Sequence, residues 1–139
     1  MLGWVFFIAI AIFLFLFLNA YNKDNDDLIG TTLEEKFSVI VNQLNHEAFN
    51  GTGVITTLSI RECHLFGTPG NQHIVFHYST GHLTVTWRYK YFQKEVILKR
   101  DLRGVRNLSI FEQERLSKEL VSEMREVIRN HQNKVLAGQ

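Results

Sequence analysis

Cysteine is nearly absent from this 139-residue sequence, which contains one, and the formal net charge is only +1. One cysteine cannot form an internal disulfide framework, so the fold has to be stable without disulfide bonds. Hydrophobic residues make up 45% of the chain, which excludes a disordered chain of low hydrophobicity. The length leaves room for one domain of roughly 110 residues after the N-terminal segment.

Sequence motifs for common enzyme chemistry are missing as well. The chain has no phosphate-binding glycine loop, no nucleophile elbow, no metalloprotease helix and no paired-carboxylate pattern. The sequence therefore predicts no catalytic residue and no cofactor.

Charge is absent from the first 18 residues, and all of them except Gly3 are hydrophobic. Leu2–Leu18 would run about 25 Å as a helix, and extension to Tyr21 brings it close to the thickness of a bilayer's hydrocarbon core. Trp4 and Tyr21 lie near the two ends, where amphipathic rings favour the headgroup region. We therefore predict a transmembrane anchor over residues 1–21, with Trp4 and Tyr21 at the membrane interfaces.

A cleaved signal peptide is the alternative interpretation of this segment. It is disfavoured because no Lys or Arg precedes the apolar run, and because the only tolerable cleavage pattern, Leu18-Asn19-Ala20, lacks a small residue at its first position. Lys23 and Lys36 follow the run, and positive charge is enriched on the cytoplasmic side of membranes. These features predict a single-pass membrane protein with a cytoplasmic domain.

A polar linker over residues 22–31 is expected to join the anchor to a globular domain over residues 32–139. Thr32 with Glu35 forms a capping box. The helix that it opens has one apolar stripe, made of Leu33, Phe37, Ile40, Val41, Leu44 and Ala48. Ser109 with Glu112 opens a second helix, which runs to about Leu136 and has apolar positions at Phe111, Leu116, Leu120, Met124, Val127, Ile128 and Val135. Each stripe needs a partner surface, most simply a sheet.

Strand-like segments fill the sequence between the two helices. A hairpin loop at Thr80-Gly81 pairs apolar residues on one face, namely Tyr78 with Leu83, Phe76 with Val85 and Ile74 with Trp87. A second hairpin, in the register that pairs Lys90 with Glu95, extends that face with the pairs Tyr89–Val96 and Trp87–Leu98.

One longer strand is expected over Val54–Phe66, with Val54, Leu58 and Ile60 directed inward. The turn Thr68-Pro69-Gly70-Asn71 would return the chain from it to the next strand. The predicted fold is α+β, a small domain of order α-β-β-β-β-α with an antiparallel meander sheet after the transmembrane helix.

Histidines stand out between Cys63 and Trp87, a stretch that contains no Asp, Glu, Lys or Arg. His73, His77 and His82 share the outer face of the predicted hairpin and are the candidate metal ligands. Zinc or copper needs ligands within about 2.0–2.3 Å of one point, whereas residues four apart on a strand are separated by about 13 Å. Surface histidines without a metal are therefore the preferred interpretation, and a pH-dependent interface is a further alternative.

Cys63 is expected to be a small strand residue rather than a nucleophile. The adjacent His64 points to the opposite side of a strand and cannot act as its base.

Charge is unevenly distributed along the domain. Between Asp24 and Glu62 there are seven acidic and two basic residues, and between Arg88 and Arg106 there are two acidic and seven basic residues. The candidate contacts to an anionic lipid or an acidic partner are Arg88, Lys90, Lys94, Lys99, Arg100, Arg103 and Arg106. Nucleic acid is disfavoured because Tyr89 and Tyr91 point inward and offer no stacking platform. The simpler alternative is a solvated strand face whose lysines discourage edge pairing.

These features together predict a membrane-anchored, non-enzymatic accessory or assembly subunit, in contact with the lipid bilayer and bound to another membrane protein or complex. Its contact surfaces would be the anchor, the outer sheet face around Thr84 and Thr86, and the far end of the last helix. The alternatives are a ligand- or metal-binding domain that uses the histidine-bearing face, and anionic-lipid contact through residues 88–106.

Overall fold

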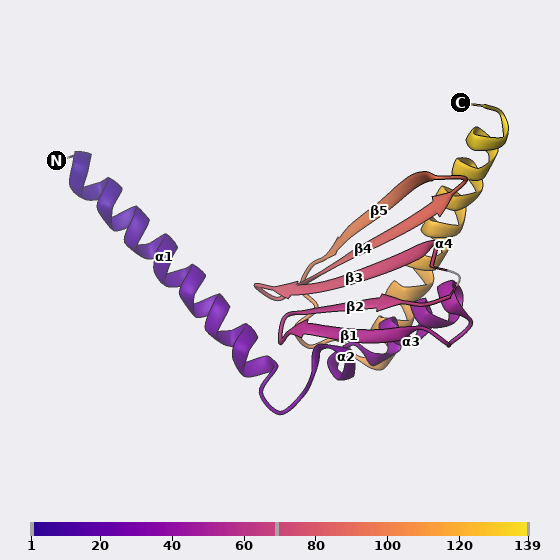
Figure 1. The fold of residues 1–139 in the computed structure, drawn as a ribbon. Helices are drawn as coiled ribbons and strands as arrows, with labels where there is room; N and C mark the ends of the chain where they lie inside the picture. The colour runs from indigo at the N-terminus through magenta and orange to yellow at the C-terminus, as the bar shows by residue number, and fades with distance from the viewer. Residues whose placement is uncertain (1, 69, 139) are drawn as a thin grey trace.

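The computed structural model describes residues 2–68 and 70–138, with the backbone alone for residues 24–27 (Figure 1). Its elements follow the order α1 (Leu2–Asp27), α2 (Leu33–Lys36), α3 (Ser38–Phe49), β1 (Val54–Ser59), β2 (Glu62–Phe66), β3 (Gln72–Ser79), β4 (His82–Tyr91), β5 (Lys94–Leu102) and α4 (Ile110–Leu136). The strands form one antiparallel sheet in the sequential order β1-β2-β3-β4-β5. The α+β fold with an antiparallel meander is therefore confirmed.

Helix α1 extends away from the domain (Figure 1). Its segment Leu2–Lys23 is long and apolar enough to cross a membrane, and none of its most apolar window is buried in the protein. By length and composition alone, a signal sequence near the N-terminus would meet the same criteria. The helix runs without a break through Leu18-Asn19-Ala20 and continues to Asp27, so the polar residues 22–27, expected to be irregular, are helical.

The first apolar stripe of the domain belongs to two helices rather than one. The capping box of Thr32 and Glu35 is formed, and the helix direction changes at Phe37, where φ is −111° and ψ is 34°. Phe37 is nevertheless buried, as are Leu33, Ile40, Val41 and Leu44. The apolar stripe predicted from the sequence is therefore buried on both sides of the break between α2 and α3.

The register of β3, β4 and β5 is the predicted one. Tyr78 pairs with Leu83, Phe76 with Val85 and Ile74 with Trp87, and on the next hairpin Tyr89 pairs with Val96 and Trp87 with Leu98. The indole Nε1 of Trp87, which is fully buried, donates a hydrogen bond to Oε1 of Gln72 (2.9 Å).

The prediction for Val54–Phe66 was wrong in two respects. This segment folds back on itself at Ile60-Arg61 and forms two paired strands, β1 and β2, so the sheet has five strands. Val54, Leu58 and Ile60 are not inward but 58%, 61% and 60% exposed. Val54 points outward because its neighbour Ile55 takes the inward position opposite Leu65. Leu58 has no partner because the register shifts between Thr57 and Ser59, and Ile60 lies in the turn.

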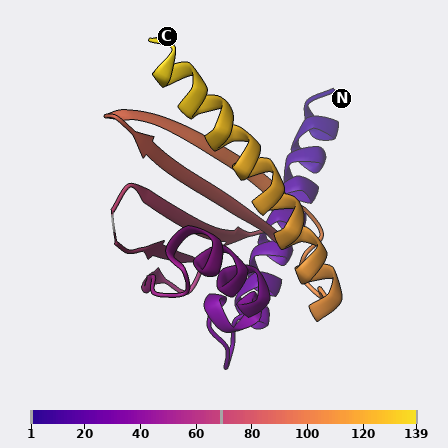
Figure 2. The same ribbon diagram turned by 90° about the vertical axis from the view of Figure 1, so that its right-hand side faces the viewer.

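Helices α3 and α4, the two longer helices of the domain, cover the same face of the sheet (Figure 2). The core between them and the sheet contains Trp87, Tyr78, Phe76 and Leu65 on the strand side, with Ile40, Leu44, Leu120 and Met124 on the helix side. The C-terminal end of α4 extends beyond the sheet (Figure 1). Phe111, placed on the apolar stripe by the sequence pattern, is exposed because it lies in the first turn of α4. Of the turn at Thr68–Asn71, Pro69 lies outside the described residues.

Candidate functional site

The outer face of the sheet, which is the face opposite α3 and α4, is made of three rows of side chains that run across all five strands. The rows are Val54, Phe66, His73, Arg88 and Ile97; then Thr56, His64, Val75, Thr86 and Lys99; then Ser59, Glu62, His77, Thr84 and Asp101. Because neither α3 nor α4 reaches this face, its side chains are only partly buried or exposed.

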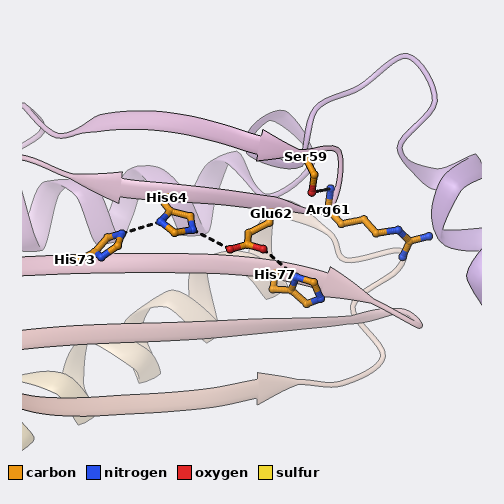
Figure 3. A network of polar contacts seen from close by, with 6 residues as sticks. All are labelled: Ser59, Arg61, Glu62, His64, His73 and His77. Carbon is orange, nitrogen blue, oxygen red and sulfur yellow. Dashed lines mark hydrogen bonds and ion pairs between the residues drawn. The ribbon is translucent and has the colours of Figure 1, made fainter.

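A polar network crosses this face between β2 and β3 (Figure 3). His64 lies at its centre, with Nε2 2.8 Å from Oε1 of Glu62 and Nδ1 2.9 Å from Nε2 of His73. The other carboxylate oxygen of Glu62 lies 3.8 Å from Nδ1 of His77. One carboxylate and three imidazoles from two strands are therefore joined in one chain.

The electrostatics of the network keep Glu62 ionised. The hydrogen bond from His64 lowers the pKa of the Glu62 carboxyl, and the nearby His77 adds to this effect. An ionised carboxylate only accepts, so Nε2 of His64 carries the proton of this contact, and the contact between Nδ1 of His64 and Nε2 of His73 needs a proton on one of these two nitrogens. Burial lowers the pKa of His73, and the charges of His64 and Arg88 lower it further.

The predicted metal candidates lie in different parts of this face. His73 contacts His64 and His77 faces Glu62. His82 is the first residue of β4, directly after the β3–β4 turn, and its Nδ1 accepts a hydrogen bond from the backbone N–H of Gly104 (3.4 Å). Among the side chains that the structure describes, which exclude those of residues 24–27, no group of three or more His, Cys, Asp or Glu is arranged to hold a metal ion. What the arrangement can do is carry hydrogen bonds and respond to protons.

Glu62 and His64 are members of the network that the sequence pattern did not single out. A signal for them exists, since His64 is two residues from Glu62 on a strand and such residues share a face. The sequence does not mark the boundary between β1 and β2. The pairing of β2 with β3 depends on that boundary, so the contact of His64 with His73 could not be predicted.

Cys63 lies on the opposite face from His64, as the sequence predicted. Its side chain is buried in the core. Burial, with smaller contributions from Glu34 and Glu62, raises the pKa of its thiol to about 12. A thiol with this pKa carries almost no thiolate at neutral pH and is a poor nucleophile.

The seven basic candidates of residues 88–106 do not form one patch. Arg88, Lys90 and Lys99 lie on the outer face, and Arg88 is 3.6 Å from a carboxylate oxygen of Glu95. Arg100 points to the helix side and pairs with Glu123 of α4. Lys94 is at the β4–β5 turn, Arg103 is exposed after β5, and the guanidinium of Arg106 lies beside Gly81 of the β3–β4 turn.

The contact between α1 and the domain is formed by Tyr21 and Arg61. The guanidinium carbon of Arg61 lies 4.0 Å from the centroid of the Tyr21 ring, and Nη2 donates a hydrogen bond to the Tyr21 carbonyl oxygen (3.0 Å). Trp4 and Tyr21 are the two residues expected at the membrane interfaces. Trp4 is exposed near the far end of α1, whereas Tyr21 contacts the β1–β2 turn.

No model of a known protein family, no curated protein and no solved structure matches this chain.

Proposed function

We propose that the protein is a membrane-anchored, non-enzymatic accessory or assembly subunit that binds another membrane protein through the outer face of its sheet. The observation that carries the proposal is the character of that face. It is not covered by α3 or α4, and it exposes the large apolar side chains of Val54, Phe66 and Ile97 in one row. Exposed apolar side chains that share a surface with polar ones are typical of protein contact sites.

The other features of the chain agree with binding rather than chemistry. The thiol of Cys63 is buried and has a raised pKa, and the imidazoles of His64 and His73 are engaged with each other. The basic side chains of residues 88–106 point in several directions, which favours a protein partner over a lipid surface as the ligand of the outer face.

The anchor explains why the partner should be a membrane protein. A domain tethered by a short linker stays near the bilayer surface, where the effective concentration of membrane neighbours is high. We place the domain on the cytoplasmic side, because Lys23 and Lys36 follow the apolar segment and positive charge is enriched on that side of membranes.

Position-specific photo-crosslinking in native membranes tests the proposal. A photo-reactive residue at position 99, on the outer face, should give one defined crosslinked product. The same residue at position 118, an exposed lysine position of α4, is the matched control and should not.

Substitution of Phe66 by Asp should abolish the product formed from position 99, because it places a charge in the apolar row. Substitution of Phe111 by Asp, at an exposed Phe of α4, should leave it intact. The proposal is wrong if position 99 gives no product, or if positions 99 and 118 give the same products.

A further inference from the structure

We propose that the tip of the β1–β2 hairpin, residues 58–61, is a second membrane contact, with Leu58 and Ile60 inserted into the interfacial region of the leaflet beside the C-terminal end of α1. This inference rests on the proposed membrane anchor. It goes beyond that proposal because it assigns a lipid-binding role to part of the folded domain.

The first observation is the exposure of two large aliphatic side chains at one tight turn. Leu58 is the residue without a partner where the β1–β2 register shifts, and Ile60 is in the two-residue turn. Both are about as exposed as the lipid-facing residues of α1. Neither contributes to the core, so their hydrophobicity is not explained by folding.

The second observation is the position of this turn relative to the anchor. Arg61 belongs to the same turn, and its guanidinium lies over the ring of Tyr21 while donating a hydrogen bond to the Tyr21 carbonyl oxygen. Figure 3 shows its side chain extending from the turn toward α1. The tip of the hairpin is therefore held against the last part of the anchor.

The depth of the contact follows from where the anchor ends. The apolar segment of α1 ends at Lys23, two residues after Tyr21. Tyrosine rings and arginine side chains near the ends of a membrane span favour the headgroup region, where the ring or the aliphatic stem lies in apolar surroundings and the polar group reaches water. A turn held at the level of Tyr21 is at this depth, which lets short aliphatic side chains reach the boundary of the acyl chains.

The two turns at this end of the sheet carry no acidic residue of their own. The β3–β4 turn lies at the same end of the sheet as the β1–β2 turn, since the strands are antiparallel neighbours. Neither Ser59–Arg61 nor Ser79–His82 contains an acidic residue. Anionic lipid would therefore meet Arg61 without repulsion from these two turns.

The consequence is a fixed orientation of the domain on the bilayer. An anchor alone would let the domain rotate about the short segment between α1 and α2, residues 28–32. A second contact at the hairpin tip removes much of this freedom and presents the outer face of the sheet to membrane neighbours at one angle.

Spin-label depth measurements on the full-length protein test the inference. The chain is reconstituted in vesicles of phosphatidylcholine with phosphatidylglycerol, and single labels are attached to the variants Ile60→Cys, Phe92→Cys and Phe13→Cys. Wild-type protein treated in the same way controls for labelling of the buried Cys63. Phe92 is the matched control, because it is an exposed apolar residue in the β4–β5 turn at the opposite end of the sheet.

We expect the label at position 60 to be more accessible to oxygen than to a water-soluble nickel chelate, and the label at position 92 to show the reverse. Position 13, in the middle of α1, reports on the anchor itself. A water-exposed label at position 60 together with a lipid-exposed label at position 13 would overturn the hairpin contact and leave the anchor standing. A water-exposed label at position 13 would overturn the anchor and with it the hairpin contact.

The role of Arg61 is read from the same label. In the background Arg61→Gln the contact with Tyr21 is weakened, and the label at position 60 should become more mobile and more accessible to the nickel chelate. An unchanged depth in this background would show that Arg61 does not hold the tip at the membrane.

Discussion

His64 is the residue on which the polar network of the outer face depends, because its two ring nitrogens contact different partners. One faces Glu62 on its own strand and the other faces His73 on β3. The contact with Glu62 determines which nitrogen of His64 carries the proton. The hydrogen bond between His64 and His73 therefore depends on a carboxylate that His73 does not contact. Removal of either neighbour would leave a half-buried imidazole nitrogen without its partner.

The lowered pKa of His73 predicts how stability changes with pH. The folded protein holds this pKa below the ordinary value of 6.5, so below that pH the unfolded chain binds more protons than the folded one. The free energy of unfolding should therefore fall as the pH decreases from about 7 to about 5. Glu62 acts in the same direction at lower pH, since its stabilising effect is present above 4.5 and is lost as the pH falls through its lowered pKa.

His73→Gln should flatten this dependence. Glutamine does not titrate but keeps an N–H group that can donate to Nδ1 of His64. The measurement is urea unfolding of the detergent-solubilised protein at a series of pH values, with His82→Gln, outside the network, as the control. A slope that stays at the wild-type value in His73→Gln would contradict the assignment.

At the scale of the element, the two capping boxes are the most reliable signals in the chain. Thr32 with Glu35 and Ser109 with Glu112 both form as the sequence predicts, with side chains and backbone N–H groups paired in both directions. They can be recognised because the whole motif lies within four residues and needs no tertiary contact.

Ser109→Ala should destabilise the protein by about 1 kcal/mol, because the backbone N–H of Glu112 loses the Ser109 Oγ that accepts its hydrogen bond (3.1 Å). Ser122→Ala, at an exposed position inside α4, is the matched control and should be neutral or slightly stabilising, since Ala has the higher helix propensity. Both values come from the midpoint of urea unfolding. Equal effects of the two substitutions would show that the cap does not stabilise α4.

The strands divide into those that a sequence can predict and those that it cannot. The register of β3, β4 and β5 is predictable because only one pairing places apolar residues opposite each other on one face, as with Phe76 and Val85. The segment Val54–Phe66 misleads because its turn, Ile60-Arg61, lacks the Gly, Asn or Asp that marks tight turns. Its exposed aliphatic residues also resemble core residues, and periodicity alone does not distinguish a buried aliphatic side chain from an exposed one.

The candidate site is less predictable than the fold for the same reason. Periodicity places His73 and His77 on the outer face, but the network also needs Glu62 and His64, whose partners follow from the β2–β3 register. A network that spans two strands can be predicted only once the pairing of both is known. The polarity of residues 22–27 likewise predicts an irregular linker, whereas the preceding helix continues through them.

At the scale of the whole molecule, the domain has two different faces and one attached end. Helices α3 and α4 cover one face of the sheet (Figure 2). The opposite face retains exposed apolar residues and the histidine network. Helix α1 meets the sheet at the end where Arg61 of the β1–β2 turn contacts Tyr21. The two proposed contacts, with a protein at the outer face and with lipid at the β1–β2 turn, therefore belong to the same sheet.

Retention of α1 is the condition on which this arrangement depends, and alkaline carbonate extraction tests it. Full-length protein should remain in the membrane pellet, because 22 consecutive residues of α1, Leu2–Lys23, are apolar enough to span the bilayer. A chain that begins at Asn22 is the control and should be released, since it lacks this segment. The intact mass of the protein from the pellet should include the residues before Ala20. If the full-length gene instead yields a soluble product whose mass lacks residues 1–20, the segment is a cleaved signal peptide and the anchor is refuted.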